Sequence, residues 1–261
     1  MTDTTFLIVD TESIPDGRLL RAVKYPELTI TEEEAIEKAR VEASELSYTG
    51  SDFIPVTFQV PVAVCVARVS RDYSLTKITC LDAPQFRPRE IVRQFWKGLE
   101  LVNGKIVTFN GRGFDLPLLE LAAFRYGIAA KQYYLSRGSR YNSNSLDLQE
   151  FFSNFGACRM NGGLNLLAKM LGLPGKMGVS GDQVYEMFRA GRYQDINDYC
   201  MFDTLDTYII FLRTRAMIGD ITADREAELI GQARDFLAGK VDEHPALRGY
   251  LDNWKVNEPW P

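Results

Sequence analysis

Apolar residues recur with two different periods along the chain, and the period changes from that of strands to that of helices. The early part predicts strands over 6–10, 60–69, 74–81 and 105–109, with a polar turn at 70–73 that makes the second and third an antiparallel pair. Helical spacing occurs at 87–101 and 114–126, and then at 146–152, 164–171, 181–190, 196–216 and 223–238. Strands therefore come early in the chain and helices late, and the early strands suggest an antiparallel meander.

A polar insert over residues 14–52 separates the first two predicted strands. Within it, Thr31 and Glu34 have the spacing of a capping box, which predicts an acidic helix. We expect the insert to form a lid, a rim or a partner surface. We also expect a main domain over 1–216, which includes the insert, and a helical extension over 217–261 packed on the same domain.

Composition narrows the class of protein. The chain has 261 residues, 46% of them hydrophobic, which is enough to bury a full core. It shows neither a signal-peptide pattern nor an apolar run long enough to span a membrane, so we expect a cytoplasmic protein. The four cysteines form no Cys-x-x-Cys pair, which favours reduced core residues over disulfides or zinc ligands. With a net charge of −5, binding a polyanion would require a local basic lining or metal ions.

Several catalytic classes lose support. The single histidine, His244, lies in a polar stretch near the C-terminus and is a poor basis for a Ser-His-Asp or Cys-His hydrolase. The stretch 172–177 has the wrong glycine spacing for a phosphate loop, and Met177 stands where Ser or Thr would bind magnesium. The stretch 110–113 is not a dinucleotide fingerprint, because Leu116 occupies the position of its third glycine.

Three short patterns carry the candidate chemistry. Asp10 and Glu12 end the first predicted strand on the same side, where they would repel each other unless a cation lay between them; a solvated turn explains this pattern alone equally well. Asp115 opens a predicted helix after a glycine-rich turn, a position that the helix dipole also favours for an acid. Tyr199 and Asp203 share one face of a late helix, as would a core tyrosine beside a surface acid.

Together and in this order, the patterns resemble a known superfamily. Asp-x-Glu on the first strand, Asn-x-x-x-Phe-Asp at a strand-to-helix turn and Tyr-x-x-x-Asp on a late helix are similar to the DEDD 3′–5′ exonucleases, in their tyrosine (DEDDy) branch. The stretches 110–117 and 199–203 look especially like predicted stand-alone exonucleases related to the proofreading domain of family B DNA polymerases. The resemblance spans about residues 5–215. It implies an α/β, ribonuclease H-like fold with a mixed five-stranded sheet flanked by helices.

The resemblance also implies a role for each acid. Asp10, Glu12 and Asp203 would hold one divalent ion, and Asp10 with Asp115 would hold a second about 4 Å away, Asp115 through water. Tyr199 would position the attacking water, and the product would be a nucleoside 5′-monophosphate. Carboxylate ligands favour Mg²⁺ or Mn²⁺. The histidine branch does not fit, because Asp198 stands where its histidine would be.

A second set of residues is expected to contact the substrate: Thr11, Asn110, Arg112, Phe114, Asp147 and Lys176. Arg112 and Lys176 would bind phosphates, although exposed loop cations are usually only solvated. Phe114 would stack a terminal base or else enter the core. Asp147 would border the metal site, but its spacing to Glu150 favours a helix start.

Three functions remain open on the sequence. The leading one is a metal-dependent 3′–5′ exonuclease that acts on single-stranded DNA or DNA 3′ ends. The second applies the same chemistry to RNA, because a contact to a 2′-hydroxyl cannot be read from this sequence. The third is a non-catalytic nucleic-acid-binding or scaffold module of the same fold. The complete set of carboxylates argues against it, since buried like charges do not stabilise a fold without a cation.

Overall fold

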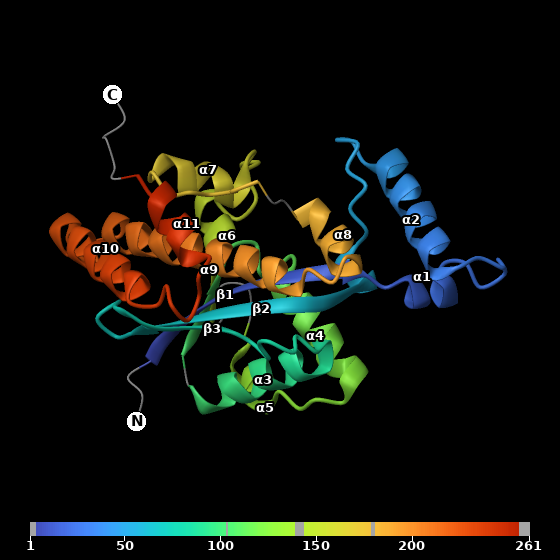
Figure 1. Ribbon diagram of the computed structural model, residues 1–261, viewed down its shortest axis with the longest axis horizontal. Coiled ribbons are helices and arrows are strands. Elements are labelled where there is room, and N and C mark those ends of the chain that lie inside the picture. The colour runs from blue at the N-terminus through green and yellow to red at the C-terminus, as the bar shows by residue number, and fades with distance from the viewer. Residues whose placement is uncertain (1–3, 103, 139–143, 179–180, 256–261) are drawn as a thin grey trace.

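A central mixed sheet with helices on both faces forms the body of the protein in the computed structural model, which describes residues 4–102, 104–138, 144–178 and 181–255 (Figure 1). The strands are β1 (Thr4–Pro15), β2 (Gln59–Ser70), β3 (Leu75–Cys80), β4 (Lys105–Thr108) and β5 (Ser145–Asp147), in the spatial order β3-β2-β1-β4-β5. The pairs β1–β2 and β2–β3 are antiparallel, whereas β1–β4 and β4–β5 are parallel. The mixed five-stranded, ribonuclease H-like sheet implied by the resemblance is therefore confirmed.

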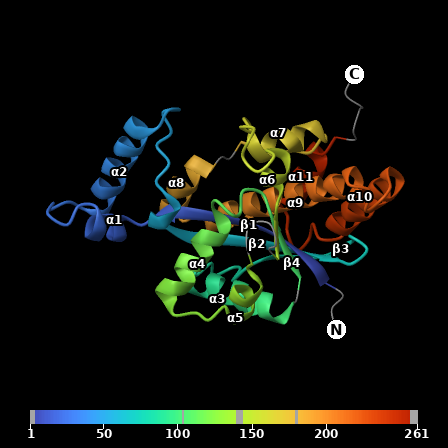
Figure 2. The same ribbon diagram turned by 180° about the vertical axis from the view of Figure 1, so that it is seen from behind.

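Two groups of helices cover the sheet. One face carries α3 (Pro88–Leu101), α4 (Asp115–Tyr126) and α5 (Lys131–Ser136) (Figure 1). The other carries α6 (Leu148–Phe152), α7 (Gly163–Met170), α9 (Tyr193–Met217), α10 (Ala223–Ala238) and α11 (Leu247–Asn253) (Figure 2). The remaining elements are α1 (Gly17–Val23), α2 (Glu32–Leu46), α8 (Val184–Arg189) and the 3₁₀ turns η1 (Val56–Phe58) and η2 (Gly181–Gln183).

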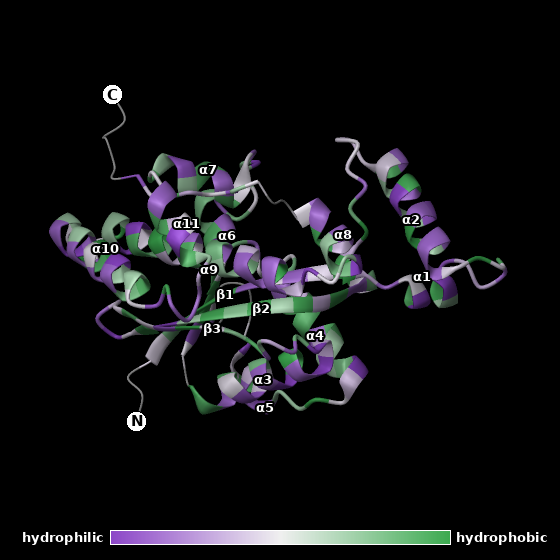
Figure 3. Ribbon diagram, viewed as in Figure 1, coloured by the Kyte–Doolittle hydropathy of each residue, from purple (hydrophilic) through white to green (hydrophobic). Residues whose placement is uncertain are grey.

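Alternation along β1 sends its side chains into two separate cores. Ile8 belongs to the core on the α9 side, whereas Leu7 and Val9 belong to the core on the α3 and α4 side. Figure 3 shows β2 largely in the hydrophobic colour, as expected for a strand covered on both faces. Each fully buried large apolar side chain contributes about 1.5–3 kcal/mol. The two cores thus hold β1 firmly between the helical layers.

β1 continues beyond its predicted end at Asp10, as far as Pro15. Its parallel pairing with β4 stops at Ile8, but its antiparallel pairing with β2 runs to the end of the strand. Near that end, Ser13 Oγ donates a hydrogen bond to Gln59 Oε1 at 3.1 Å. Asp10 and Glu12 therefore lie within the strand, past the point where β4 stops pairing, and not in a turn.

One helix prediction is wrong in part. Residues 146 and 147 of the helix predicted at 146–152 belong to β5, and only Leu148–Phe152 are helical. Such a short strand gives too little alternation to be told from the first turn of a helix. Helices α1, α5 and α11 were not predicted. The helices predicted at 87–101, 114–126, 164–171, 196–216 and 223–238 are confirmed, with ends within about three residues.

The insert lies in the segment between β1 and β2, which runs on to Phe58 and which we call the insert from here on. This segment has a small core of its own, which includes Leu20, Ile36 and Ile54. The predicted capping box is present at the start of α2: Glu34 N donates to Thr31 Oγ1 at 3.1 Å, and Thr31 N donates to Glu34 Oε2 at 2.7 Å. Both views show α1 and α2 beyond one end of the sheet, on the side where α8 lies (Figure 1, Figure 2).

The helices after residue 216 share the core of α9. Leu229 and Leu237 of α10 and Leu247 and Tyr250 of α11 are buried in the same cluster as the apolar side chains of α9. None of the helices in the described ranges has the length and apolar character needed to cross a membrane.

Candidate metal centre and substrate cleft

The alternation of β1 decides which way each candidate residue points. Because Ile8 faces α9, Asp10 and Glu12 face it too, and Thr11 faces α4. α9 brings Asp203 to the same place. One carboxylate oxygen from each of Asp10, Glu12 and Asp203 lies within 4.8 Å of the others. Two segments far apart in the sequence thus form a compact acidic triad.

Asp115 lies beside this triad and is held from the other face of β1. Thr11 Oγ1 donates to Asp115 Oδ1 at 2.7 Å, and the Asp115 side chain is buried. As the first residue of α4, Asp115 is also at the positive end of the helix dipole. Its negative charge contributes to the raised pKa values of Asp10 and Glu12, so the fourth carboxylate is electrostatically part of the cluster.

Burial raises the pKa of every carboxyl in the cluster, and repulsion by neighbouring carboxylates adds to this for Asp10 and Glu12. Burial is the largest cause for Asp10 and Glu12, and neighbouring carboxylates add to it. Burial raises the pKa of Asp203 to about 6 and that of Asp115 to about 7. A fully ionised cluster of this kind is unfavourable unless a cation compensates its charge.

The donor set fits a hard divalent cation. Asp10 Oδ2 is buried and has no hydrogen-bond partner among the described residues, although buried polar atoms in proteins are nearly always paired. The available ligands are carboxylate oxygens. Cys200 lies close by, but its thiol donates to the backbone oxygen of Asp10 at 3.3 Å. Oxygen ligands of this type favour Mg²⁺ or Mn²⁺ over metals that prefer thiolates.

Tyr199 is buried on α9 and faces the carboxylates. Burial first, and then the charges of Asp203, Glu12 and Asp10, raise the pKa of its phenol above the usual range. The phenol therefore stays protonated at neutral pH and can donate a hydrogen bond. Its interaction with Asp203 lowers the pKa of that carboxyl, which opposes the effect of burial.

Asp147 at the end of β5 holds the glycine-rich turn between β4 and α4. Its carboxylate accepts hydrogen bonds from Asn110 N at 2.9 Å and Arg112 N at 3.0 Å. It also caps α6 through Gln149 N at 3.0 Å. The helix-start interpretation favoured for Asp147 agrees with this geometry, and its carboxylate is engaged by backbone donors.

A cleft of about 720 Å³ opens in front of the carboxylates. Of the six residues expected to contact the substrate, Thr11, Asn110, Phe114 and Lys176 line it, whereas Arg112 and Asp147 are not among its lining residues. Asp10, Glu12 and Asp115 form part of its wall. Arg112 lies 3.4 Å, Nε to Oε2, from Glu150.

The insert and α8 supply the opposite wall, which the sequence patterns did not reveal. Arg40 of α2, Phe53 in the segment before β2 and Tyr185 of α8 line the cleft. None of these residues belongs to a recognisable motif. The sequence did offer one signal, the insert itself, because a long polar segment between two strands indicates a rim or a lid.

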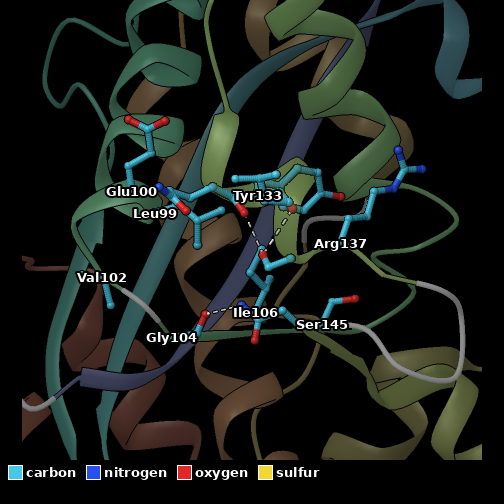
Figure 4. A pocket seen from close by; sticks show the side chains of 12 residues that line it. Leu99, Glu100, Val102, Gly104, Ile106, Tyr133, Arg137 and Ser145 are labelled. Atoms are coloured by element: carbon cyan, nitrogen blue, oxygen red, sulfur yellow. Dashed lines mark hydrogen bonds between the residues drawn. The ribbon is translucent and has the colours of Figure 1, made fainter.

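A second cavity, of about 300 Å³, lies among α3, α5 and the starts of β4 and β5. Figure 4 shows Leu99, Ile106 and Tyr133 at this cavity, with the charged side chains of Glu100 and Arg137 extending from different segments. None of the predicted site residues lines it. This second cavity therefore carries none of the candidate chemistry.

The fold and the acidic cluster define an α/β protein of the ribonuclease H-like class with a group of carboxylates that could hold a metal ion. The chain belongs to the family described as predicted 3′–5′ exonucleases related to the exonuclease domain of PolB, which matches residues 51–254. The resemblance seen in the sequence is thereby confirmed. The family match begins after β1, so Asp10 and Glu12 lie outside the matched segment.

A solved structure agrees with this assignment at the level of fold. The family B DNA polymerase from the hyperthermophilic archaeon Pyrobaculum calidifontis matches 81% of this chain with a TM-score of 0.52 and 15% sequence identity. The match covers 24% of the polymerase chain, so this protein spans about a quarter of its length. No curated protein matches the chain.

Proposed function

We propose that the protein is a metal-dependent 3′–5′ exonuclease of the tyrosine branch that releases nucleoside 5′-monophosphates from single-stranded DNA or DNA 3′ ends. The observation that carries this proposal is the convergence of Asp10, Glu12 and Asp203 within 4.8 Å. Asp115 is anchored next to them by Thr11. Membership of a family of predicted 3′–5′ exonucleases supports the same reaction.

Asp10, Glu12 and Asp203 would bind one Mg²⁺ or Mn²⁺ ion, and Asp10 with Asp115 a second, Asp115 through water. The two ions would make the attacking water easier to deprotonate and stabilise charge on the leaving 3′-oxygen. In this assignment, a metal ion would be the partner of the buried Oδ2 of Asp10, which has no hydrogen-bond partner among the described residues. The assignment also gives the raised pKa values of the cluster a functional reason, since a bound cation favours the ionised carboxylates.

Tyr199 would orient the attacking water. Its phenol is protonated and lies close to Asp203, toward which it can donate. A phenol oxygen also accepts hydrogen bonds, so the same group can hold the water that attacks phosphorus. Replacing Tyr199 by Phe should therefore reduce turnover more than it reduces substrate binding.

Four residues of the cleft would hold the end of the strand: Thr11, Asn110, Phe114 and Lys176. Lys176 follows a loop that is tied to α7, because Lys176 N donates to Asn165 Oδ1 at 2.9 Å. Its charge lowers the pKa of both Glu12 and Asp203, so it is close enough to act on a phosphate bound there. Arg112 and Asp147 would act through the glycine-rich turn, not by contact with the substrate.

A time course on 5′-labelled single-stranded DNA and RNA of matched sequence tests the proposal, in Mg²⁺ and in Mn²⁺. We expect a descending ladder with DNA that is lost in chelator and in Asp10→Ala. Asp235→Ala, which removes an exposed carboxylate on α10, is the matched control and should leave the ladder unchanged.

Each other outcome has a definite meaning. Faster degradation of RNA than of DNA would assign the activity to RNA. Equal activity in wild type and Asp10→Ala would show that a contaminant is responsible. If neither polymer is degraded with either metal, the exonuclease proposal is wrong, and a non-catalytic nucleic-acid-binding or scaffold role takes its place.

A further inference from the structure

Phe53 is a large apolar side chain left exposed at the cleft by a fixed backbone. Phe53 is 55% exposed, whereas the next residue, Ile54, is 2% exposed and belongs to the core of the insert. The segment is held further by Gln59 Nε2, which donates to Ile54 O at 2.8 Å. The chain therefore anchors itself through Ile54 and presents Phe53 to the cleft.

Phe114 meets Phe53 from the other wall. The two ring centroids are 5.9 Å apart and the rings are tilted by 58°. Phe114 directly precedes Asp115, whose carboxylate is bound to Thr11 beside the acidic triad. Two segments far apart in the sequence thus form one continuous aromatic surface immediately next to the metal centre.

Arg40 adds a cation to the same wall. Its guanidinium lies over the ring of Tyr185, 5.1 Å from the centroid. Its Nε is 4.0 Å from Asp52 Oδ2, and the Asp52 side chain is 60% exposed. An ion pair this long and this exposed to solvent is weak. Arg40 is therefore positioned by an aromatic ring yet able to exchange its carboxylate partner for a phosphate.

We propose that Phe53 and Arg40 form the binding site for the unpaired nucleotides next to the scissile phosphate. Phe53, together with Phe114, stacks a base, and Arg40 binds a backbone phosphate. The site selects 3′ ends that are single-stranded, because a base stacked within a duplex has no free face for the aromatic surface. It accepts any sequence, since every base has a face that can stack. This inference rests on the proposed exonuclease function and assigns the insert its role.

The test measures binding directly, in an Asp203→Asn background that does not cleave, with Mg²⁺ present. Fluorescence anisotropy of a labelled single-stranded oligonucleotide gives Kd with and without Phe53→Ala. We expect Phe53→Ala to weaken binding about 5- to 150-fold, the range for the loss of one stacked base. Phe53→Trp should restore it and Phe53→Leu should not. Phe124→Ala, which removes an 88% exposed ring elsewhere on α4, should have no effect.

A second oligonucleotide, whose last two residues lack bases, separates stacking from a general loss of structure. The protein with Phe53 should bind it more weakly than the intact strand, and Phe53→Ala should produce no further loss. For Arg40, Arg40→Gln should weaken binding to both oligonucleotides and make it less sensitive to salt. Lys38→Gln, on the same helix and paired with Glu42, is the matched control.

The possible results separate this inference from the function on which it rests. If Phe53→Ala binds the intact strand as tightly as the parent, or if neither protein binds it, the aromatic site is disproved. Hydrolysis of a p-nitrophenyl ester of thymidine 5′-monophosphate, which lacks a preceding nucleotide, tests the metal centre alone. Wild type and Phe53→Ala should have the same kcat on this ester at saturation; no hydrolysis by either would count against the exonuclease function and leave the binding result intact.

Discussion

Asp203 shows what the acidic cluster does to the folded protein when no cation is bound. Burial raises its pKa to about 6, above the value of about 3.9 for an unfolded chain. The folded protein therefore keeps a proton that the unfolded chain has lost, and stability falls as pH rises between these values. Asparagine does not ionise. In chelator, Asp203→Asn should exceed wild type in stability at pH 8 by on the order of 1–3 kcal/mol, and by less at pH 5.

Thermal unfolding of both proteins at the two pH values measures this difference. With Mg²⁺ present, the difference in stability between the two proteins should become smaller or change sign, because the ion binds the native wild type and stabilises it by mass action. Asp235→Asn, at an exposed position, controls for a general change in surface charge. A less stable Asp203→Asn in chelator at pH 8 would contradict a raised pKa of Asp203 in the folded state.

Asp206 is a buried acid on α9 outside the proposed metal centre. It is 1% exposed, Tyr250 Oη donates to its Oδ1 at 2.7 Å, and burial raises its pKa to about 7. By the same linkage, Asp206 lowers stability as pH rises from about 4 to 7. Asp206→Asn should therefore flatten the pH dependence of stability in this range, with exonuclease activity within about twofold of wild type. Urea unfolding at a series of pH values checks this; an unchanged slope would contradict it.

Among the elements, the turn between β4 and α4 leaves no space for an added side-chain atom. A Cβ at Gly111 would lie 2.2 Å from Thr108 Oγ1, and Thr108 is fully buried. Gly111→Ala must therefore displace the turn that carries Asn110 and leads into Asp115. We expect a loss of about 1–3 kcal/mol in stability, together with a fall in kcat larger than tenfold, because the fourth carboxylate moves.

Gly231→Ala is the matched control for this substitution. Gly231 lies inside α10, where an added Cβ meets nothing within 4 Å, and alanine favours a helix over glycine by about 1 kcal/mol. This variant should be as active as wild type and slightly more stable. Equal activity of Gly111→Ala and Gly231→Ala would mean that the turn does not position the site.

The sequence predicted those elements whose pattern is long or whose chemistry is local. The capping box at Thr31 could be read directly, because its two residues lie close together in the chain. The helix that carries Tyr199 could be read because its apolar pattern is long. β5 was missed because a short strand has almost no period. The full length of β1 was missed because the residues from Asp10 to Ser13 are polar and interrupt its apolar pattern.

The candidate site, too, could be predicted only in part. Asp10, Glu12, Asp115 and Asp203 stood out because a superfamily pattern joins them in order, and the structure brings three of them within 4.8 Å. The wall formed by Phe53 was not predictable. The position of Phe53 depends on the burial of Ile54 in the core of the insert. This burial is a tertiary contact, which the local sequence does not predict.

For the whole molecule, the net charge of −5 limits how the protein can hold a polyanion. Two cations of the cleft, Lys176 and Arg40, are available to bind phosphates in our proposals. Each phosphate contact on a single strand contributes about −0.7 to the slope of log K against log salt, so the expected slope is about −1.4. The protein should therefore depend on stacking and bound metal more than on counterion release.

Binding of a single-stranded oligonucleotide by Asp203→Asn at several KCl concentrations and constant Mg²⁺ measures this slope. Lys176→Gln should reduce its magnitude by about 0.7, and Arg40→Gln by the same amount, because each removes one phosphate contact. Arg248→Gln, on α11 and away from the cleft lining, should leave it unchanged. A slope of about −4 or steeper would require several further phosphate contacts. In that case the strand would cross a basic surface elsewhere on the protein, and the cleft beside β1 would hold only its last nucleotides.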